Sequence, residues 1–391
     1  MEYIRLTAKH KFKGHEKRIN GFVFLHDNEH VVSGSEDGTM RKWNCETGCL
    51  VGEPWEGEGK SIWSLALSPD KQTIACGRED GSVQRWNTNG EMSEGIWTGH
   101  SSLVRSVSWS PSGGHITSGS YDGTILIRNA ESGEVEVGPI ETKQGWVYSL
   151  SYSPLGERIA SGGYKTICIR DSNTGELLVG PIKDLGTWVS SMAWSSDSSK
   201  IYAASGNCAS VFDSGSGILF HRFEHDDDLY SVALSPTHNV LACAGFRGVA
   251  QLWDTESHQA LGQRFSRRDS RVLCCMLFSR DGRYLAYGGD DKEITLWMVE
   301  EIAPQLQNVT KEESRSESPT LSSILNVSNY HTSLLALLTG PSQVDATNLF
   351  ARHGGDDSVE EGANNPYDNF FRVIVVFCHA QATTNDRAHY S

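Results

Sequence analysis

Seven segments of this 391-residue chain repeat one order of residue types, at intervals of 41 to 44 residues. Each segment begins with alternating apolar residues, passes through a turn into a run of small residues, and ends on Trp or a replacement. The first and third copies also carry an early Gly-His, at His15 and His100. The terminal positions on this frame are Trp43, Trp86, Arg128, Arg170, Phe212, Trp253 and Trp297. Repeats of this length bury their apolar faces against one another, so the seven are expected to form one closed domain.

The third repeat illustrates why each copy predicts four short strands. Residues 104–109 alternate apolar and polar side chains, and residues 110–113 supply the Pro and Gly of a turn. Residues 115–119 are small enough for the middle of a packed sheet, and Asp122-Gly123 is a strong hairpin signal. The pattern therefore predicts an all-β, seven-bladed β-propeller over residues 1–300.

The two ends of the repeat region predict how the ring closes. The seventh repeat stops at Trp297 without a fourth strand, whereas residues 3–12 precede the first Gly-His and resemble a fourth strand. We expect this N-terminal segment to complete the seventh blade, because closure removes two open sheet edges.

Residues 301–391 break the period and are predicted to form a largely disordered tail. Residues 311–319 are rich in Ser and Glu, and residues 354–366 are rich in Gly, Asp and Asn. Such compositions bury too little apolar surface to fold. Two short apolar islands, 333–338 and 370–378, interrupt the tail. Each island is either a docking segment or weakly structured chain, and the sequence leaves both alternatives open.

Charge and composition disfavour several classes of partner. Asp and Glu number 49 against 34 Lys and Arg, which gives a net charge of −15, and no basic stripe is available for a phosphate backbone. The longest apolar run, 373–378, is too short to span a bilayer, and the N-terminus lacks the apolar core of a signal peptide. Nine scattered cysteines suit a reducing compartment. We expect a monomeric ring in the cytoplasm, with the nucleus also open, that binds neither nucleic acid nor membrane.

Motifs for catalysis and cofactor binding are incomplete. Gly59-Lys60-Ser61 resembles the end of a phosphate-binding loop, but Pro54 stands where that loop needs its first glycine. Cys45 and Cys49 have no second pair to complete a zinc site, and no Gly-x-Ser-x-Gly nucleophile motif occurs. The sequence therefore predicts no catalytic residue, no metal and no cofactor.

The repeats resemble the WD-repeat propeller family over residues 1–300. In that family a His, a Ser or Thr of the second strand, the hairpin Asp and the Trp form a hydrogen-bonded tetrad that stabilises each blade. The resemblance assigns a complete tetrad to the first repeat and partial ones to the third, second and seventh: His15, Ser33, Asp37 and Trp43; His100, Ser118 and Asp122; Asp80 and Trp86; Asp291 and Trp297. The spacers, such as residues 174–182, are similar to WD repeats common in fungi, in stand-alone propellers and downstream of NACHT-type ATPase modules.

Family members that grip peptides use three positions per repeat at one end of the ring. These positions follow the first Val or Ile of the first strand, lie two residues before that, and precede the hairpin Asp. The partner-binding residues that the resemblance implies are Trp63, Arg105, Tyr148, Tyr230, Trp146, Trp188, Tyr121, Phe246, Arg18 and Arg271. Aromatic and Arg side chains dominate binding hot spots. Alternatively, some of these rings plug the ring opening or pack between blades.

These observations predict a non-enzymatic scaffold that binds a protein or peptide on the aromatic and Arg-rich central face. We expect Trp63, Arg105, Tyr148 and Tyr230 to be exposed there. The alternative is a propeller enzyme, of the hydrolase or lyase type, with its site in the central channel. Such enzymes converge carboxylates, His or a metal on that face, whereas here the acidic residues are dispersed over four repeats.

Overall fold

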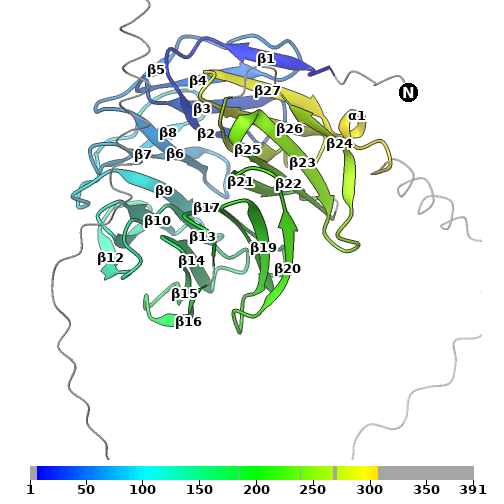
Figure 1. The fold of residues 1–391 in the computed structure, drawn as a ribbon. Coiled ribbons are helices and arrows are strands. Elements are labelled where there is room, and N and C mark those ends of the chain that lie inside the picture. The colour runs from blue at the N-terminus through cyan, green and yellow to red at the C-terminus, as the bar shows by residue number, and fades with distance from the viewer. Residues whose placement is uncertain (1–6, 184, 238, 267–270, 307–391) are drawn as a thin grey trace, which may run out of the picture. The chain divides into compact units, whose positions relative to one another are not determined.

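Seven antiparallel sheets are arranged in a ring (Figure 1). The computed structural model describes residues 7–183, 185–237, 239–266 and 271–306. Six of the sheets have four strands, and the second has three, with further single bridges from Val83 to Trp97 and from Trp86 to Met92. The predicted all-β, seven-bladed propeller is confirmed.

The strands follow the repeats in chain order. The first three blades contain β2 (Ile19–Phe24), β3 (His30–Ser35), β4 (Thr39–Asn44) and β5 (Trp55–Glu56); β6 (Ile62–Leu67), β7 (Thr73–Arg78) and β8 (Val83–Asn87); and β9 (Val104–Trp109), β10 (His115–Ser120), β11 (Thr124–Asn129) and β12 (Val135–Glu141). The fourth and fifth contain β13 (Ser149–Tyr152), β14 (Arg158–Gly162), β15 (Ile167–Asp171) and β16 (Leu177–Ile182); and β17 (Val189–Trp194), β18 (Lys200–Ser205), β19 (Cys208–Asp213) and β20 (Leu219–Glu224). The last two contain β21 (Leu229–Leu234), β22 (Val240–Gly245), the short helix η1 (Phe246–Gly248), β23 (Val249–Asp254) and β24 (Ala260–Ser266); and β25 (Leu273–Phe278), β26 (Tyr284–Gly289), β27 (Glu293–Met298) and β1 (His10–Lys13).

The first strand of every blade lies innermost. Each first strand contacts the first strand of the next blade, and β2 contacts β25, so the circle is closed. Small residues near the end of each second strand allow this approach. A Cβ added to Gly34 would lie 2.7 Å from Ile62 Cγ2, and one added to Gly119 would lie 2.5 Å from Val147 Cγ1. The small-residue run of the repeat is therefore a packing requirement between neighbouring sheets.

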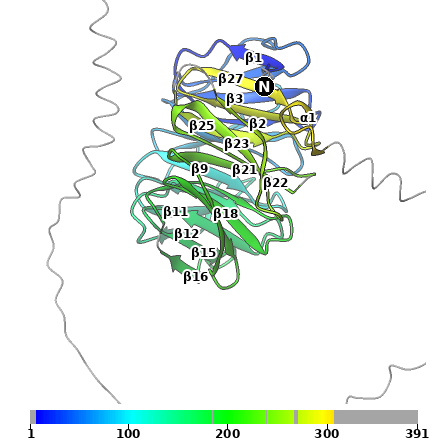
Figure 2. The ribbon, with the colours of Figure 1, turned by 45° about the vertical axis from the view of Figure 1, so that its right-hand side comes forward.

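The N-terminal strand completes the seventh blade. β1 pairs antiparallel with β27, with Phe12 opposite Ile294, and the two strands lie side by side in both views (Figures 1 and 2). The strand is shorter than the segment 3–12 expected from the sequence, and residues 1–6 lie outside the described part. Phe12 is 1% exposed and stacks on Trp43 of the first blade, with ring centroids 5.6 Å apart. This one side chain thus joins the seventh blade to the first.

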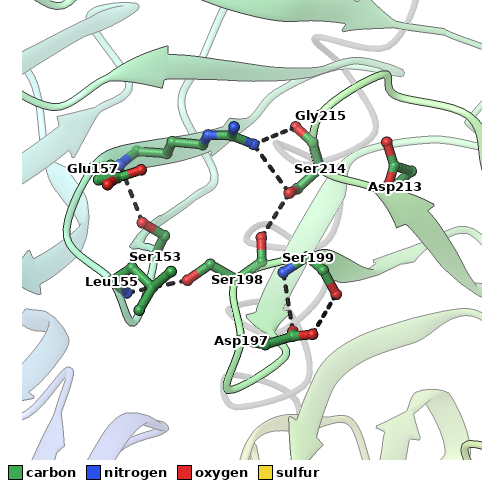
Figure 3. Close-up of a pocket in the computed structure, with 10 residues that line it drawn as sticks. Ser153, Leu155, Glu157, Asp197, Ser198, Ser199, Asp213, Ser214 and Gly215 are labelled. Atoms are coloured by element: carbon green, nitrogen blue, oxygen red, sulfur yellow. Dashed lines mark hydrogen bonds between the residues drawn. The ribbon is translucent and has the colours of Figure 1, made fainter. Parts of the chain in front are cut away.

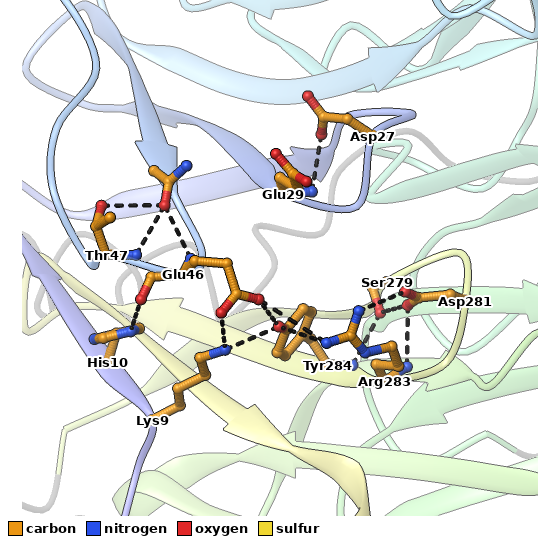
Figure 4. Close-up of polar contacts among 11 residues, drawn as sticks. Lys9, His10, Asp27, Glu29, Glu46, Thr47, Ser279, Asp281, Arg283 and Tyr284 are labelled. Carbon is orange, nitrogen blue, oxygen red and sulfur yellow. Dashed lines mark hydrogen bonds and ion pairs between the residues drawn. The ribbon is translucent and has the colours of Figure 1, made fainter.

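A polar network on the surface reinforces the same junction (Figure 4). Lys9 Nζ donates to Glu46 Oε2 at 2.8 Å and to the Tyr284 hydroxyl at 2.9 Å. The Tyr284 hydroxyl in turn donates to the other Glu46 oxygen. Arg283 lies over the Tyr284 ring, 5.2 Å from its centroid. The network connects the N-terminal segment, the first blade and the seventh.

The chain continues after the last strand into a short packed segment. Helix α1 (Val299–Ile302) follows β27, and Ala303 is fully buried in the core between the sixth and seventh blades. The boundary at residue 300 predicted from the sequence therefore falls within α1. The predicted tail, including the islands 333–338 and 370–378, lies outside the described residues from 307 onward.

Candidate functional site

One end of the ring gathers the residues that the sequence singled out. First strands begin where second strands end, because the two pair antiparallel, as Ile19 does with Ser35. The starts of the first strands and the following hairpins therefore lie at the same end of every blade. We call this end the central face.

Five aromatic side chains of the third, fourth and fifth blades form one continuous cluster on the central face. Tyr121 stacks on Trp146 at 4.6 Å between centroids, with the ring planes 8° apart. Trp146 stacks on Trp188 at 5.7 Å, and Trp188 contacts Tyr164 at 4.6 Å. These four rings are partly exposed. We call the cluster of Tyr121, Trp146, Tyr148, Tyr164 and Trp188 the aromatic platform.

Tyr148 differs from the other members of the aromatic platform. It was expected to be exposed, but it is only 5% exposed. Its ring lies within 4.5 Å of Trp188, 5.0 Å of Tyr121 and 6.0 Å of Trp146, measured between centroids. Rings contributed by three consecutive blades surround it, so Tyr148 supports the platform from below instead of offering a surface of its own. The alternative that some rings pack between blades is correct for this residue.

Trp63 and Arg105 lie in the neighbouring part of the central face. Both are partly buried, Trp63 in β6 and Arg105 in β9. The Arg105 guanidinium lies 5.8 Å from the centroid of the Trp63 ring, which is a cation–π distance. The two side chains link the second blade to the third.

The opposite part of the central face, formed by the sixth, seventh and first blades, is charged. Arg18 Nε lies 3.3 Å from Asp290 Oδ1, and Arg271 Nη1 donates to the Asp290 carbonyl at 3.3 Å. Burial disfavours the charge of Arg18, but the nearby Cys274, Asp290 and Glu36 outweigh it and raise the pKa of Arg18. Burial raises the pKa of the Glu36 carboxyl.

The two remaining predicted contacts, Tyr230 and Phe246, belong to the sixth blade. Tyr230 is partly buried in β21, and burial followed by the charge of Asp228 raises the pKa of its hydroxyl. Phe246 is 43% exposed in η1. Among the described residues neither ring pairs with the aromatic platform, so the central face consists of an aromatic half and a charged half with two flanking rings.

The tetrad residues of the first and third blades are hydrogen-bonded. His15 Nδ1 donates to Asp37 Oδ2 at 2.8 Å, and its Nε2 lies 2.7 Å from Ser33 Oγ, which also accepts from Trp43 Nε1 at 2.8 Å. Burial opposes ionisation of Asp37, but the hydrogen bond and charge of His15 and the hydrogen bonds from Thr39 together outweigh it and hold the pKa of Asp37 well below its usual range.

The third blade repeats this arrangement without the Trp. His100 bridges Asp122, at 3.0 Å, and Ser118, at 2.8 Å. Arg128 replaces the Trp and donates to the Gly133 carbonyl at 2.9 Å and to the Thr98 carbonyl. The guanidinium therefore connects the turn that contains Gly133 to the segment that contains Thr98.

Other blades fill the His position with side chains that the sequence frame did not identify. In the fourth blade Gln144 accepts from Ser161 Oγ at 2.7 Å and donates to the Thr166 carbonyl at 3.1 Å. In the second, Arg78 is fully buried and donates to the Lys60 carbonyl at 2.7 Å. The signal for Gln144 was available, because Gln144 precedes Ser161 by 17 residues and His15 precedes Ser33 by 18. Arg78 lies in the second strand of its blade, whereas the tetrad His precedes the first strand. The sequence separation between His and Ser therefore could not identify Arg78.

The second and seventh blades retain only parts of the tetrad. Asp80 accepts from Ser82, from the backbone at 3.0 Å and from Oγ at 2.6 Å. Trp86 has Cys76 where Trp43 has Ser33, and it stacks on Trp55 at 6.3 Å between centroids. Asp291 accepts from the Glu293 backbone at 3.3 Å, and Trp297 packs beside Phe265 at 5.3 Å. These residues stabilise their hairpins and the outer core.

A polar pocket of about 290 Å³ lies at the other end of the ring, between the fourth and fifth blades (Figure 3). Arg158 Nη1 donates to the Ser214 carbonyl at 3.1 Å, and Ser214 Oγ donates to the Ser198 carbonyl at 2.6 Å. Hydrogen bonds from Ser195 and Ser199 lower the pKa of Asp197 to about 2. The lining groups bind one another, so the pocket is a weaker candidate than the central face.

In the part of the chain that the structure describes, no group of three or more His, Cys, Asp or Glu is placed to hold a metal ion. Within the same ranges, no helix combines the length and the apolar character needed to cross a membrane.

Comparison with known proteins assigns the family. Six segments match the WD domain, G-beta repeat: residues 6–44, 49–87, 92–129, 137–171, 217–254 and 261–298. Together they cover more than half of the chain. The chain belongs to the WD40 family. The unmatched stretch contains most of the fifth WD40 blade, where Phe212 stands in the Trp position and Leu185 in the His position.

Relatives of this WD40 protein include subunits of larger assemblies. Guanine nucleotide-binding protein subunit beta of Nicotiana tabacum is 33% identical over 73 residues, which is 19% of each chain. The same subunit of Arabidopsis thaliana is 33% identical over 70 residues, or 18% of each chain. Small ribosomal subunit protein RACK1y of Oryza sativa subsp. japonica is 28% identical over 312 residues, covering 76% of this chain and 78% of that protein. The chain therefore spans about a fifth of the length of the beta-subunit relatives and most of the rice relative.

Proposed function

We propose that this WD40 protein is a non-enzymatic scaffold that binds a protein or peptide partner on its central face. The observation that carries the proposal is the aromatic platform, in which four partly exposed rings rest on a buried fifth. Rings held by rigid strands lose little conformational entropy on binding and offer a large apolar area. The family relation agrees with this role, because the tobacco relative is named as a subunit and the rice relative as a protein of the small ribosomal subunit.

The enzyme alternative has less support on this face. Two of the acidic groups there already have partners, since Glu79 accepts from Ser61 Oγ at 2.7 Å and Asp290 pairs with Arg18. Measurement of metal content in the purified protein tests the alternative, because stoichiometric metal would favour it. A cytoplasmic location, a monomeric ring and a lineage near the fungal repeats remain proposals that rest on sequence.

The test replaces exposed rings of the aromatic platform. Trp146→Ala and Trp188→Ala are each expected to weaken binding of a partner by roughly 1–4 kcal/mol, as hot-spot truncations do. The matched control is Leu155→Ala, because Leu155 is 65% exposed beside the polar pocket at the other end of the ring. Full-length tagged proteins would be compared by quantitative affinity purification from the source cells, after melting curves verify that each variant folds. Partners retained by the Trp variants but lost by the Leu155 variant would refute the central-face assignment.

A further inference from the structure

The three arginines of the central face differ in what they bind within the protein. Arg18 and Arg271 both engage Asp290, through its carboxylate and its carbonyl respectively. Arg105 makes no hydrogen bond and no ion pair with any described residue. Its guanidinium makes a cation–π contact with the ring of Trp63. The five N–H donors of its guanidinium are therefore available to acceptors that a ligand supplies.

Arg105 lies in β9, the innermost strand of the third blade. Its positive charge acts on the thiols of Cys274 and Cys275, whose pKa values burial raises and Arg105 partly lowers again. Those cysteines lie in β25 of the seventh blade, across the ring from β9. Arg105 therefore lies near the ring centre in the third blade, the same blade that carries Tyr121, whose backbone N–H donates to the Leu103 carbonyl just before β9.

The acidic residues of the face do not offer the same opportunity to a basic ligand. Asp290 is paired with Arg18, Glu79 accepts from Ser61, and Glu36 lies within the field of Arg18. Asp228 is exposed, so water already solvates it. Of Arg18, Arg105 and Arg271, Arg105 is thus the one that has no hydrogen bond or ion pair to a described residue.

Resting on the proposed function, we infer that the partner presents an anionic group beside an aromatic or apolar side chain. Arg105 binds the anion, a carboxylate or a phosphate, through the paired N–H donors of its guanidinium, and the neighbouring side chain packs on the aromatic platform. The ligand is a linear peptide segment, because Arg105 and Tyr121 share the third blade, the rest of the platform follows on the next two blades, and an extended chain can reach both.

Selection from a library of random linear peptides displayed on phage tests the inference with the full-length protein. Peptides enriched on the wild type are expected to combine Asp or Glu with a nearby aromatic residue. Arg105→Glu should lower their affinity by about 10- to 100-fold, the range expected for loss of hydrogen bonds to a charged group. Arg280→Glu is the matched control, because it makes the same charge change at an exposed turn. Arg105→Gln replaces Arg105→Glu if the latter does not fold.

The outcomes separate the two proposals. Enriched peptides without acidic residues, equal binding to the Arg105 variants, or no enriched peptide would overturn the inference. If enriched peptides bind equally to the Arg105 variants but lose affinity for Trp146→Ala, the central-face scaffold is supported and the anion site is refuted. If their binding depends on neither Arg105 nor Trp146, both proposals are refuted. Synthetic peptides with phosphoserine or Glu at the acidic position then distinguish a phosphate from a carboxylate, and binding of either one that requires Arg105 supports the inference.

Discussion

Phe12 provides the sharpest test of how this propeller closes. Its ring is 1% exposed, lies in the one strand that the N-terminus adds to the seventh blade, and stacks on Trp43 of the first. Phe12→Ala removes the buried ring and leaves a cavity between two blades, which typically costs about 3–5 kcal/mol. An unfolding entropy of about 2 cal/mol/K per residue over about 300 residues gives roughly 0.6 kcal/mol/K, so the expected fall in Tm is about 5–8 °C.

The assay is thermal unfolding followed by circular dichroism, with urea unfolding as a second measure of the free energy. Phe220→Ala is the matched control, because Phe220 is 55% exposed on the outer strand β20 and should change stability by no more than about 0.5 kcal/mol. A Tm for Phe12→Ala within about 1 °C of the wild type would refute the reasoning, because the ring would then unfold independently of its closing strand.

Two further predictions concern buried polar groups. Burial, followed by the charge of Arg264, lowers the pKa of His225 to about 4 in the folded protein. Between pH 6.5 and 4 the unfolded chain therefore binds a proton at His225 that the folded protein does not bind. The free energy of unfolding should consequently fall as the pH is lowered through this range, by up to about 1.4 kcal/mol per pH unit. His225→Gln should flatten this decline in urea unfolding at several pH values, and an unchanged slope would contradict it. Arg78 is fully buried with Nε and Nη2 unbonded, so Arg78→Met should cost less than about 1 kcal/mol or stabilise the fold, whereas Ser33→Ala, which removes two buried hydrogen bonds, should cost about 1–3 kcal/mol. Equal falls in Tm for Arg78→Met and Ser33→Ala would contradict this prediction.

Sequence reasoning was most successful where a residue acts within its own repeat. The number of blades follows from the number of repeats. The hydrogen bonds of His15 and His100 join residues at fixed sequence separations within one blade. It was less successful for residues that replace a missing member of the tetrad. Arg78 occupies the space of a missing His from a different strand, and only three-dimensional proximity reveals this.

The sequence by itself determined the fold, the approximate closing segment and the residue types of the central face, because these depend on periodicity and on local turn and strand chemistry. Only the tertiary structure decided how those side chains divide into roles. Tyr148 and Trp63 occupy equivalent positions in their repeats, yet Tyr148 is buried by rings from both neighbouring blades, whereas Trp63 lies beside Arg105. Exposure and charge pairing depend on which blades are neighbours in the ring, and a repeat pattern read one copy at a time carries no information about those contacts.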